Sequence, residues 1–534
     1  MNVSHSLPRL LVFAFTTVGI LASVIFGALI GKADWLPLAM GLALCSVIFT
    51  VAVGQRHLVG MCLLIACLDF TIAPLGFKIG AMEQTGILTF LVWLSVFWRK
   101  QVIAAVPTAC ANYHVYKLFR MCVILMGCYA VLHFAFNGMF PYDEGAWGLN
   151  AASKVYAQVF GVFVMIVAIL DSRIGVKRDG YKNKTLMGFI FISLLLAIVL
   201  RSVLFFRYGG SIADYQDEFS NRFEANSALN YALHIPIINL VDSPYTLRVL
   251  APAACLVGSV FFFLPKGRYR PPILSLSLVA CGILGSLLSG GRAALVFSLV
   301  FISVGALYSR RIMFVLASAA AAVLVFATVL VVPETMIESL PYYAQRSVGW
   351  LRPDVKSDAI LGIKGSTDKR LDWLKYSWDY WSKGDARLLV TGRSVGSMDA
   401  QDVAGYLNYN DSVTMWFAIK RLSTHNGFMD LVIGFGLIGY FFVMLSSILL
   451  VGLLLHHQKA SRNDPQVGAW SFIAAVFLMF WIAYTHFAGS NIWSLCIWFA
   501  IIALVQKPRD NQSSIKIEHA PVSPDLSGIR ENTT

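Results

Sequence analysis

The sequence predicts an all-α polytopic membrane protein, and three observations carry this prediction. Hydrophobic residues make up 57% of the 534 residues and charged residues 13%, about half the charged share of a soluble domain. Apolar runs of roughly 18 residues or more recur along the chain. Basic residues cluster after alternate runs, as at Arg99-Lys100 and Lys177-Arg178, which the positive-inside rule predicts for cytoplasmic loops. The net charge of +13 therefore indicates membrane topology and not nucleic-acid binding.

The apolar runs predict about fourteen membrane spans, each long enough to cross the hydrocarbon core. The predicted spans are 10–31, 35–53, 57–75, 79–98, 117–136, 154–170, 185–206, 246–264, 272–289, 292–308, 312–332, 427–455, 467–486 and 489–505. The residues from 506 to 534 are polar and have no apolar period, so we predict a disordered tail there.

The basic loops set the topology. With Arg99-Lys100 and Arg173–Lys184 in the cytoplasm, both termini and the tail are cytoplasmic. The same parity holds if 272–308 is a re-entrant pair instead of two spans. The segments predicted on the outer face are 137–153, 207–245, 289–292 and 333–426. The chain thus divides into spans within 1–332, a large external segment over 333–426, and further spans within 427–505.

The external segment 333–426 is too large to serve only as a connection between two helices. It is polar, nearly balanced in charge, and contains Trp373, Trp378 and Trp381, whose rings are able either to stack on sugars or to anchor the chain at a membrane interface. We therefore expect chemistry in the aqueous phase next to the bilayer.

Arg292 opens a predicted span directly after Ser289-Gly290-Gly291, on the face where the positive-inside rule disfavours arginine. One interpretation is a side chain that reaches the outer lipid headgroups. The other is an anion-binding guanidinium at a helix N-terminus, where the helix dipole and free N–H groups also favour negative charge.

Arg222 is a second candidate, in the external segment 207–245. Glu218 and Glu224 lie nearby in the sequence and are able to pair with it. Arg201 and Arg207 flank the start of this segment and are alternatives to Arg222.

His425 stands between the external segment and a long apolar span, and Asn426 follows it. Because the pKa of histidine is near 6.5, a neutral imidazole there is able to accept a proton at physiological pH. The alternative is a simple contact with lipid headgroups.

The sequence contains no recognisable metal-binding or nucleotide-binding motif. His-Glu-x-x-His, paired cysteines and a Walker sequence are all missing, and eight of the nine cysteines lie inside apolar runs. We therefore expect no metal, no cofactor and no disulfide framework. The energy for a reaction must then come with the substrate, and an activated lipid-linked donor meets that need. Transfer of a sugar from a lipid pyrophosphate needs a base for the acceptor hydroxyl and guanidinium groups for the departing diphosphate. His425, Arg292 and Arg222 supply a minimal set.

Four motifs in sequence order resemble the O-antigen ligase and polymerase superfamily of bacterial envelope glycosyltransferases. The motifs are Ser289–Ala293, Arg370–Trp373, Thr391–Ser397 and the run from His425 through the glycine-rich stretch to Gly439. Members of this superfamily carry a large periplasmic loop before a His-Asn motif and a Gly-rich span. The resemblance covers mainly residues 280–440.

The resemblance implies a GT-C-like bundle of about 12–14 helices in the bacterial inner membrane, with its active site facing the periplasm. It implies a metal-independent, inverting transferase that uses an undecaprenyl-pyrophosphate glycan donor, with functional roles for Arg292 and His425. The chain departs from the family pattern in two places. Arg222 is not followed by Asn-Pro-Asn, and Arg393 stands where a small or apolar residue is usual, which suggests an extra phosphate or sugar contact. Arg207, Arg370 and Asn426 are secondary candidates.

The acceptor remains open between lipid A core, as in an O-antigen ligase, and a growing glycan, as in a polymerase. A transporter of polysaccharide or lipid-linked oligosaccharide is the third reading. That class favours ionisable residues near the bilayer midplane and internal repeats. Asp69 and Arg120 lie near predicted span ends, and no repeat is visible. The polar groups gather at the outer boundary, which favours transfer over translocation.

Overall fold

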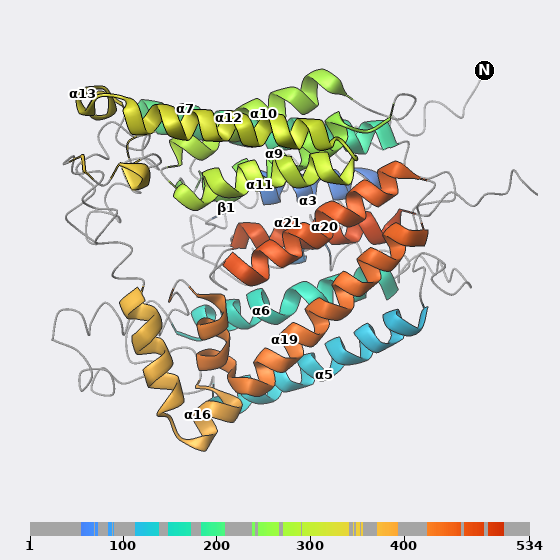
Figure 1. The fold of residues 1–534 in the computed structure, drawn as a ribbon. Coiled ribbons are helices and arrows are strands. Elements are labelled where there is room, and N and C mark those ends of the chain that lie inside the picture. Colours follow the sequence, from blue (N-terminus) through green and yellow to red (C-terminus); the bar gives the residue numbers. More distant parts are fainter. Residues whose placement is uncertain are drawn as a thin grey trace, which may run out of the picture.

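In the computed structural model the chain is almost entirely helical (Figure 1). The structure describes residues 55–68, 70–72, 84–87, 89, 113–137, 148–171, 183–208, 238–240, 244–265, 271–289, 291–340, 345, 349–352, 354–355, 371–393, 424, 426–460, 464–484 and 490–506. The predicted spans 10–31 and 35–53, most of 79–98 and the tail after Gln506 lie outside this part.

Four helices in the described part are long and apolar enough to cross a membrane, in agreement with the predicted all-α membrane protein. They are His114–Phe136, Leu186–Val203, Ile312–Val331 and Gly427–Ala460. The other apolar helices are shorter.

Every predicted span from 117–136 onward overlaps a helix. The helices before the external segment are α3 (Gln55–Leu68), α5 (Tyr113–Asn137), α6 (Gly148–Asp171), α7 (Asn183–Tyr208), α9 (Pro244–Phe262), α10 (Pro272–Leu288), α11 (Arg292–Tyr308) and α12 (Ile312–Val331). The external segment contains α13 (Glu334–Glu338), the 3-10 turn η4 (Gly349–Leu351), a helix over 371–382 and α16 (Ala386–Thr391). The helices after it are α19 (Gly427–Ala460), α20 (Pro465–Tyr484) and α21 (Ser490–Val505).

The predicted span 57–75 is wrong at its end. Helix α3 stops at Leu68, and β1 (Phe70–Ile72) pairs antiparallel with β2 (Ile238–Leu240), so that Phe70 lies opposite Leu240. All three residues of β1 (Phe, Thr and Ile) are β-branched or aromatic and fit a pleated surface, as does Ile238 of β2. Topological parity had already put the end of this span and the segment 207–245 on the same face, so the strand pair is compatible with that topology.

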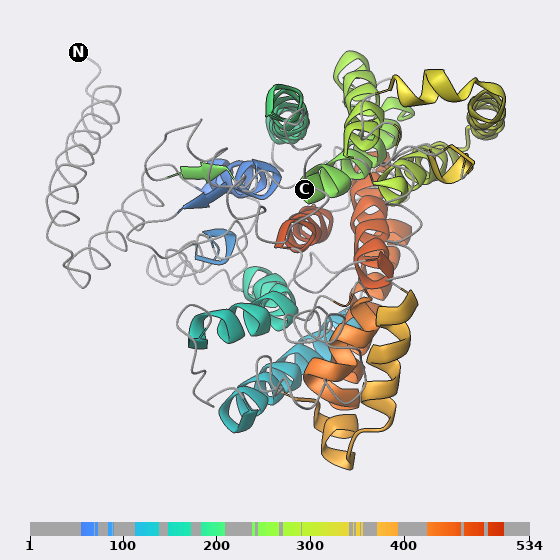
Figure 2. The same cartoon turned by 90° about the vertical axis from the view of Figure 1, so that its left-hand side faces the viewer.

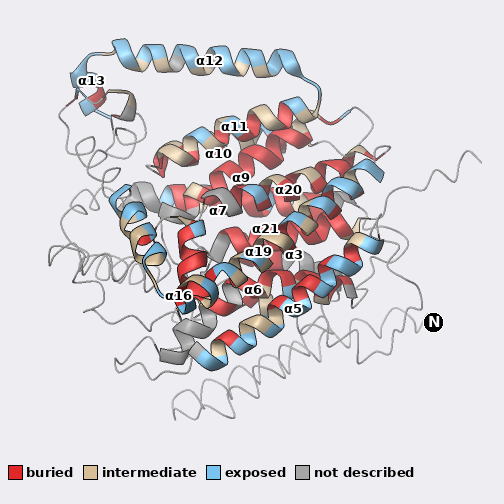
Figure 3. Ribbon diagram, turned by 60° about the horizontal axis from the view of Figure 1, so that its bottom comes forward, coloured by how far each residue is buried: buried red, intermediate tan, exposed pale blue. Residues whose placement is uncertain are grey.

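The core is built by helices that are apolar on every side. All residues of α21 from Ile492 to Leu504 are buried, as is the middle of α9, so these two apolar helices have neighbours on all faces (Figure 3). The Trp481 and Trp493 rings lie 3.6 Å apart between α20 and α21. By contrast, most residues of α12 are exposed to the bundle's surroundings (Figure 3).

Two features of the bundle position the candidate site. Gly258, Gly282 and Gly305 allow α9, α10 and α11 to approach closely, because a Cβ at each would collide with the neighbouring helix. Helix α5 runs beside α19, and α16 with the helix over 371–382 lies against the N-terminal part of α19 (Figures 1 and 2).

Candidate functional site

The N-terminus of α19 is held by a network of capping hydrogen bonds. The side-chain oxygen of Asn426 accepts a hydrogen bond from the Met429 N–H at 3.1 Å, which makes Asn426 the N-cap. Thr424 donates from its backbone N–H and its hydroxyl to the buried Asp430 carboxylate, at 2.8 and 2.7 Å. His425 itself lies outside the described residues. The residues on either side of it are thus tied to the first turn of α19.

Helix α19, which starts at Gly427, is broken about two and a half turns later, at Gly436. This residue has φ 65° and ψ −175°, a backbone conformation open almost only to glycine. Gly392, with φ 74°, lies directly against it, and a Cβ on either glycine would collide with the other residue's backbone. The two glycine-rich motifs therefore meet at a backbone contact between Gly392 and Gly436.

The carbonyl groups left without helical partners at this break find other donors. The Arg393 N–H donates to the Ile433 carbonyl at 2.9 Å. The hydroxyl of Tyr129, from α5, lies between the carbonyls of Thr391 and Phe435 and donates to them. Satisfied carbonyls allow the break to exist inside a buried environment.

A buried histidine completes this network. His133 of α5 donates from Nε2 to the Thr391 carbonyl at 2.7 Å, because a carbonyl oxygen can only accept. Its Nδ1 is then the acceptor in a neutral ring and receives the hydroxyl proton of Tyr156, from α6. We name Tyr129, His133, Tyr156 and the Gly392–Gly436 contact the hinge network.

The helix over 371–382 covers the segment of α19 before the break. Trp373, Tyr376, Tyr380 and Trp381 pack against the buried side chains of α19 in that segment. Two of the three tryptophans considered for sugar stacking, Trp373 and Trp381, are therefore packed against α19, while Trp378 is 48% exposed. The guanidinium of Arg393 lies 5.7 Å from the centre of the Tyr380 ring, within cation–π range.

Arg292 lies at the first position of α11, and a second arginine lies beside it. Arg248, about one turn into α9, donates from Nε to the Ser289 carbonyl at 3.3 Å, and its side chain would touch a Cβ at Gly291. Neither helix has an acidic residue in its first turn. Arg292 thus opens α11, and the Arg248 side chain lies at the turn between α10 and α11, where its Nε binds the carbonyl of Ser289, the C-cap residue of α10.

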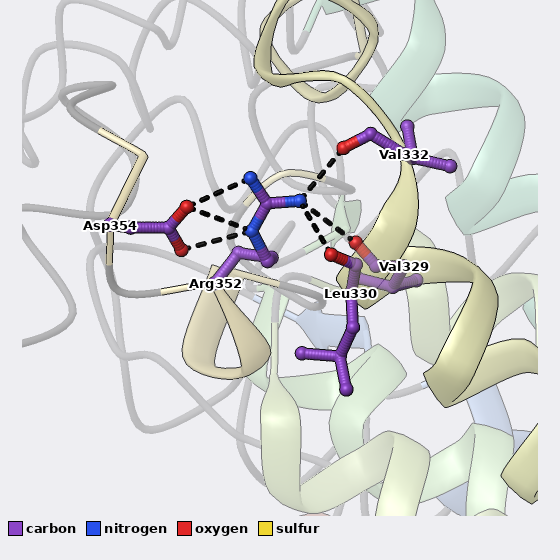
Figure 4. A network of polar contacts seen from close by, with 5 residues as sticks. All are labelled: Val329, Leu330, Val332, Arg352 and Asp354. Carbon is purple, nitrogen blue, oxygen red and sulfur yellow. Dashed lines mark hydrogen bonds and ion pairs between the residues drawn. The ribbon is translucent and has the colours of Figure 1, made fainter.

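Two further arginines in the predicted external half also bind carbonyls at helix C-termini. Arg201 is buried and donates to the carbonyl of Leu68, the last residue of α3. Arg352 donates from Nη1 to the carbonyls of Val329, Leu330 and Val332 at the end of α12 and binds Asp354 bidentately (Figure 4). These carbonyl ends carry the negative pole of the helix, so the two arginines act as caps.

Replacing Arg352 with methionine should fray the last turn of α12. The change removes every guanidinium contact with the carbonyls of residues 329–332, and we expect amide hydrogen exchange there to become a few-fold faster. Asp354→Asn is the control, because it keeps the carbonyl contacts and should have the smaller effect. Equal exchange in Arg352→Met and the parent protein would contradict the capping role.

The ion pair between Arg352 and Asp354 should make the stability at the end of α12 depend on pH. The Arg352 guanidinium holds the pKa of the Asp354 carboxyl below its usual range. The stabilisation is therefore present above the unfolded pKa of about 4 and is lost as the pH falls through the lower folded pKa. Exchange at the end of α12, corrected for intrinsic rates, should begin to rise as the pH falls below about 4 and should level off below the folded pKa.

The sequence-predicted residues are only partly in the described structure. Arg292, Arg393 and Asn426 are described, with Arg393 and Asn426 both contacting the segment of α19 before the break. Arg222, Arg370 and His425 lie outside the described residues, and Arg207 lies in α7 with its side chain outside them. Arg292 belongs to α11, which contacts α20 through the Phe297 and Phe480 rings, and α20 in turn packs on α19.

Sequence reasoning missed Arg248 and the hinge network. The signal for Arg248 is the one that identified Arg292, an arginine near the outer start of a predicted span. The signal for His133 is a titratable residue within an apolar span, where polar groups are costly and commonly functional. Within the described part of the chain, no group of three or more His, Cys, Asp or Glu side chains is arranged to hold a metal ion.

The fold defines the class of protein: almost entirely helical, with helices long and apolar enough to cross a membrane. No protein-family model matches the chain, and no curated protein is significantly similar to it.

Proposed function

We propose that this protein is a glycosyltransferase of the bacterial inner membrane. It transfers a glycan from undecaprenyl pyrophosphate to an acceptor hydroxyl at the periplasmic face, and lipid A core as acceptor makes it an O-antigen ligase. In this proposal the helices form a GT-C-like bundle and residues 333–426 are a periplasmic loop. His425 is the base, and Arg292 binds the diphosphate.

The observation that carries the proposal is the placement of Arg292 at the first position of α11, with the Arg248 side chain at the turn between α10 and α11 that precedes it. Helix N-termini favour anions, by about 0.3–1 kcal/mol for each charge. An anion bound at the start of α11 would interact with this helix dipole and with both arginines, and the planar guanidinium fork suits a diphosphate. Arg248 therefore joins Arg292 as a proposed diphosphate ligand, with Arg222, Arg207 and Arg393 as further candidates.

The second support is the capping of α19. His425 stands between Thr424 and Asn426, which are both hydrogen-bonded at the first turn of that helix. A base must be held within hydrogen-bond reach of the proton that it takes, so a rigid frame around His425 suits this role.

The proposed reaction balances without a metal or a cofactor. His425 takes the proton of the acceptor hydroxyl, and the acceptor oxygen attacks the anomeric carbon of the donor glycan. The bond between that carbon and the pyrophosphate oxygen breaks, and undecaprenyl pyrophosphate leaves with the electron pair while the arginines hold its charge. Attack from the opposite face inverts the anomeric centre.

The test is reconstitution of the purified protein with lipid-linked glycan and lipid A core in EDTA. We expect product from the parent protein and a loss on the order of 10²–10³ in rate for His425→Ala and for Arg292→Ala. Arg292→Lys should recover only part of the rate, since an ammonium keeps the charge but loses the fork. Lys383→Gln, which removes an exposed charge paired with Asp379, is the matched control and should leave the rate unchanged.

The outcomes separate the alternatives. Full activity in both site variants would refute the assigned residues, and a metal requirement would refute the mechanism. Extension of the donor glycan alone, with lipid A core ignored, would identify a polymerase. Movement of lipid-linked glycan between leaflets without any new glycosidic bond would identify a transporter.

A further inference from the structure

The turn between α11 and α12 brings two arginines together in an unusual backbone conformation. The Arg310 N–H bonds to the Leu307 carbonyl at 2.9 Å and the Arg311 N–H to the Ala306 carbonyl at 2.8 Å, which is the Schellman pattern. Arg310 occupies its left-handed position, with φ 58°. Glycine is the usual residue there, and a side chain costs about 1–2 kcal/mol. An arginine kept at this cost suggests a role for its side chain.

The two arginines form the rim of an apolar groove of about 570 Å³. The groove is lined by Phe262 and Phe263 at the end of α9, by Arg310 and Arg311, and by Ile312, Met313 and Phe314 at the start of α12. The Phe263 and Phe314 rings contact each other edge to face, with centroids 4.7 Å apart. Arg310 and Arg311 are exposed. Ile312 is 60% exposed and Met313 is 77% exposed.

The location of the groove restricts its occupant. It lies at the other end of α11 from Arg292, at the end of the bundle away from α13 and α16 (Figure 1). The groove lining contains two cations, no acid and five apolar side chains. A soluble anion would satisfy the cations but leave the apolar wall exposed, whereas a molecule with a phosphate beside hydrocarbon chains satisfies both.

We propose that this groove binds an anionic phospholipid. Arg310 and Arg311 hold the phosphate, and the acyl chains lie along Phe262, Phe263 and Phe314. Basic pockets between helix ends are sites where acidic lipid headgroups bind. This site is separate from the proposed transferase site and does not depend on that function.

The experiment is native mass spectrometry of the full chain in detergent, titrated with phosphatidylglycerol and, in parallel, with neutral phosphatidylcholine. We expect preferential binding of phosphatidylglycerol, and affinity about fivefold weaker for each charge removed in Arg310→Gln, Arg311→Gln and the double variant. Millimolar inorganic phosphate should not displace the lipid, because the groove also binds its chains.

Two further variants separate lipid binding from folding and from general charge. Arg310→Gly suits the left-handed position, so its melting temperature should be equal or higher while its affinity for phosphatidylglycerol falls. Lys459→Gln removes an exposed charge from the last turn of α19 and should leave the affinity unchanged. Equal binding of both lipids, an equal loss in Lys459→Gln, or displacement of the lipid by phosphate would each overturn the proposal.

Discussion

Replacing Gly436 with alanine is expected to destabilise the protein by roughly 3 kcal/mol or more, because two separate costs act at this residue. The backbone at φ 65° and ψ −175° costs a residue with a Cβ about 1–3 kcal/mol. The added methyl group would also collide with the Val390 carbonyl and the Gly392 N–H, and overpacking of this kind costs a similar amount. We expect low yield from the membrane and a clearly lowered melting temperature in detergent.

The matched control is Gly452→Ala, in the same helix. Nothing lies within 4 Å of a Cβ at Gly452, and alanine is the better helix former by up to about 1 kcal/mol. This variant should melt at the parent temperature or slightly above it. If Gly436→Ala had the same melting temperature as Gly452→Ala, the native helix would not be broken at Gly436. Gly392→Ala should resemble Gly436→Ala, since its Cβ would collide from the other side of the same contact.

The glycine pair also illustrates what sequence reasoning could and could not predict. Apolar runs predicted the helices well, because membrane burial needs only length and low polarity. Gly434, Gly436 and Gly439 look alike in the sequence and were predicted only as part of a glycine-rich span. Gly436 differs from the other two in its positive φ, which it adopts where the chain meets Gly392. A contact between segments so far apart along the chain leaves no local pattern.

The arginines show the same limit of sequence-based prediction, here for electrostatic contacts. Arg201, Arg248 and Arg292 all lie near outer ends of predicted spans, and composition does not separate them. The polarity of the neighbouring helix end separates Arg292, which opens α11, from Arg201, which binds the last carbonyl of α3. Arg248 lies beside the start of α11 but binds the C-cap carbonyl of α10. Topological parity already contained the polarity of each span, so Arg248 could have been predicted. The partner of Arg201 could not, because it depends on which helices pack together.

Removing the Tyr129 hydroxyl is expected to be the second large effect. In Tyr129→Phe the carbonyl of Phe435 at the break in α19 loses its donor, and an unsatisfied buried carbonyl costs about 1–3 kcal/mol. The volume of the side chain is unchanged, so the loss in melting temperature reports the hydrogen bond and not a cavity. Tyr308→Phe, in α11 and away from the break, is the control for losing a tyrosine hydroxyl elsewhere, since its hydroxyl hydrogen-bonds to Gln458.

A double-mutant cycle shows whether the hinge network acts as a unit. Tyr129 and His133 share the Thr391 carbonyl as acceptor, so the effects of Tyr129→Phe and His133→Phe should not add; we expect a coupling of about 0.5–3 kcal/mol. Additive effects would mean that the two side chains stabilise the protein independently.

The network joins α5 and α6 to the segment of α19 that follows His425, so the proposed transferase activity supplies a second measurement. Under that proposal, variants that still fold should lose kcat more than they raise KM, because a displaced base weakens the transition state and leaves donor binding to the arginines intact.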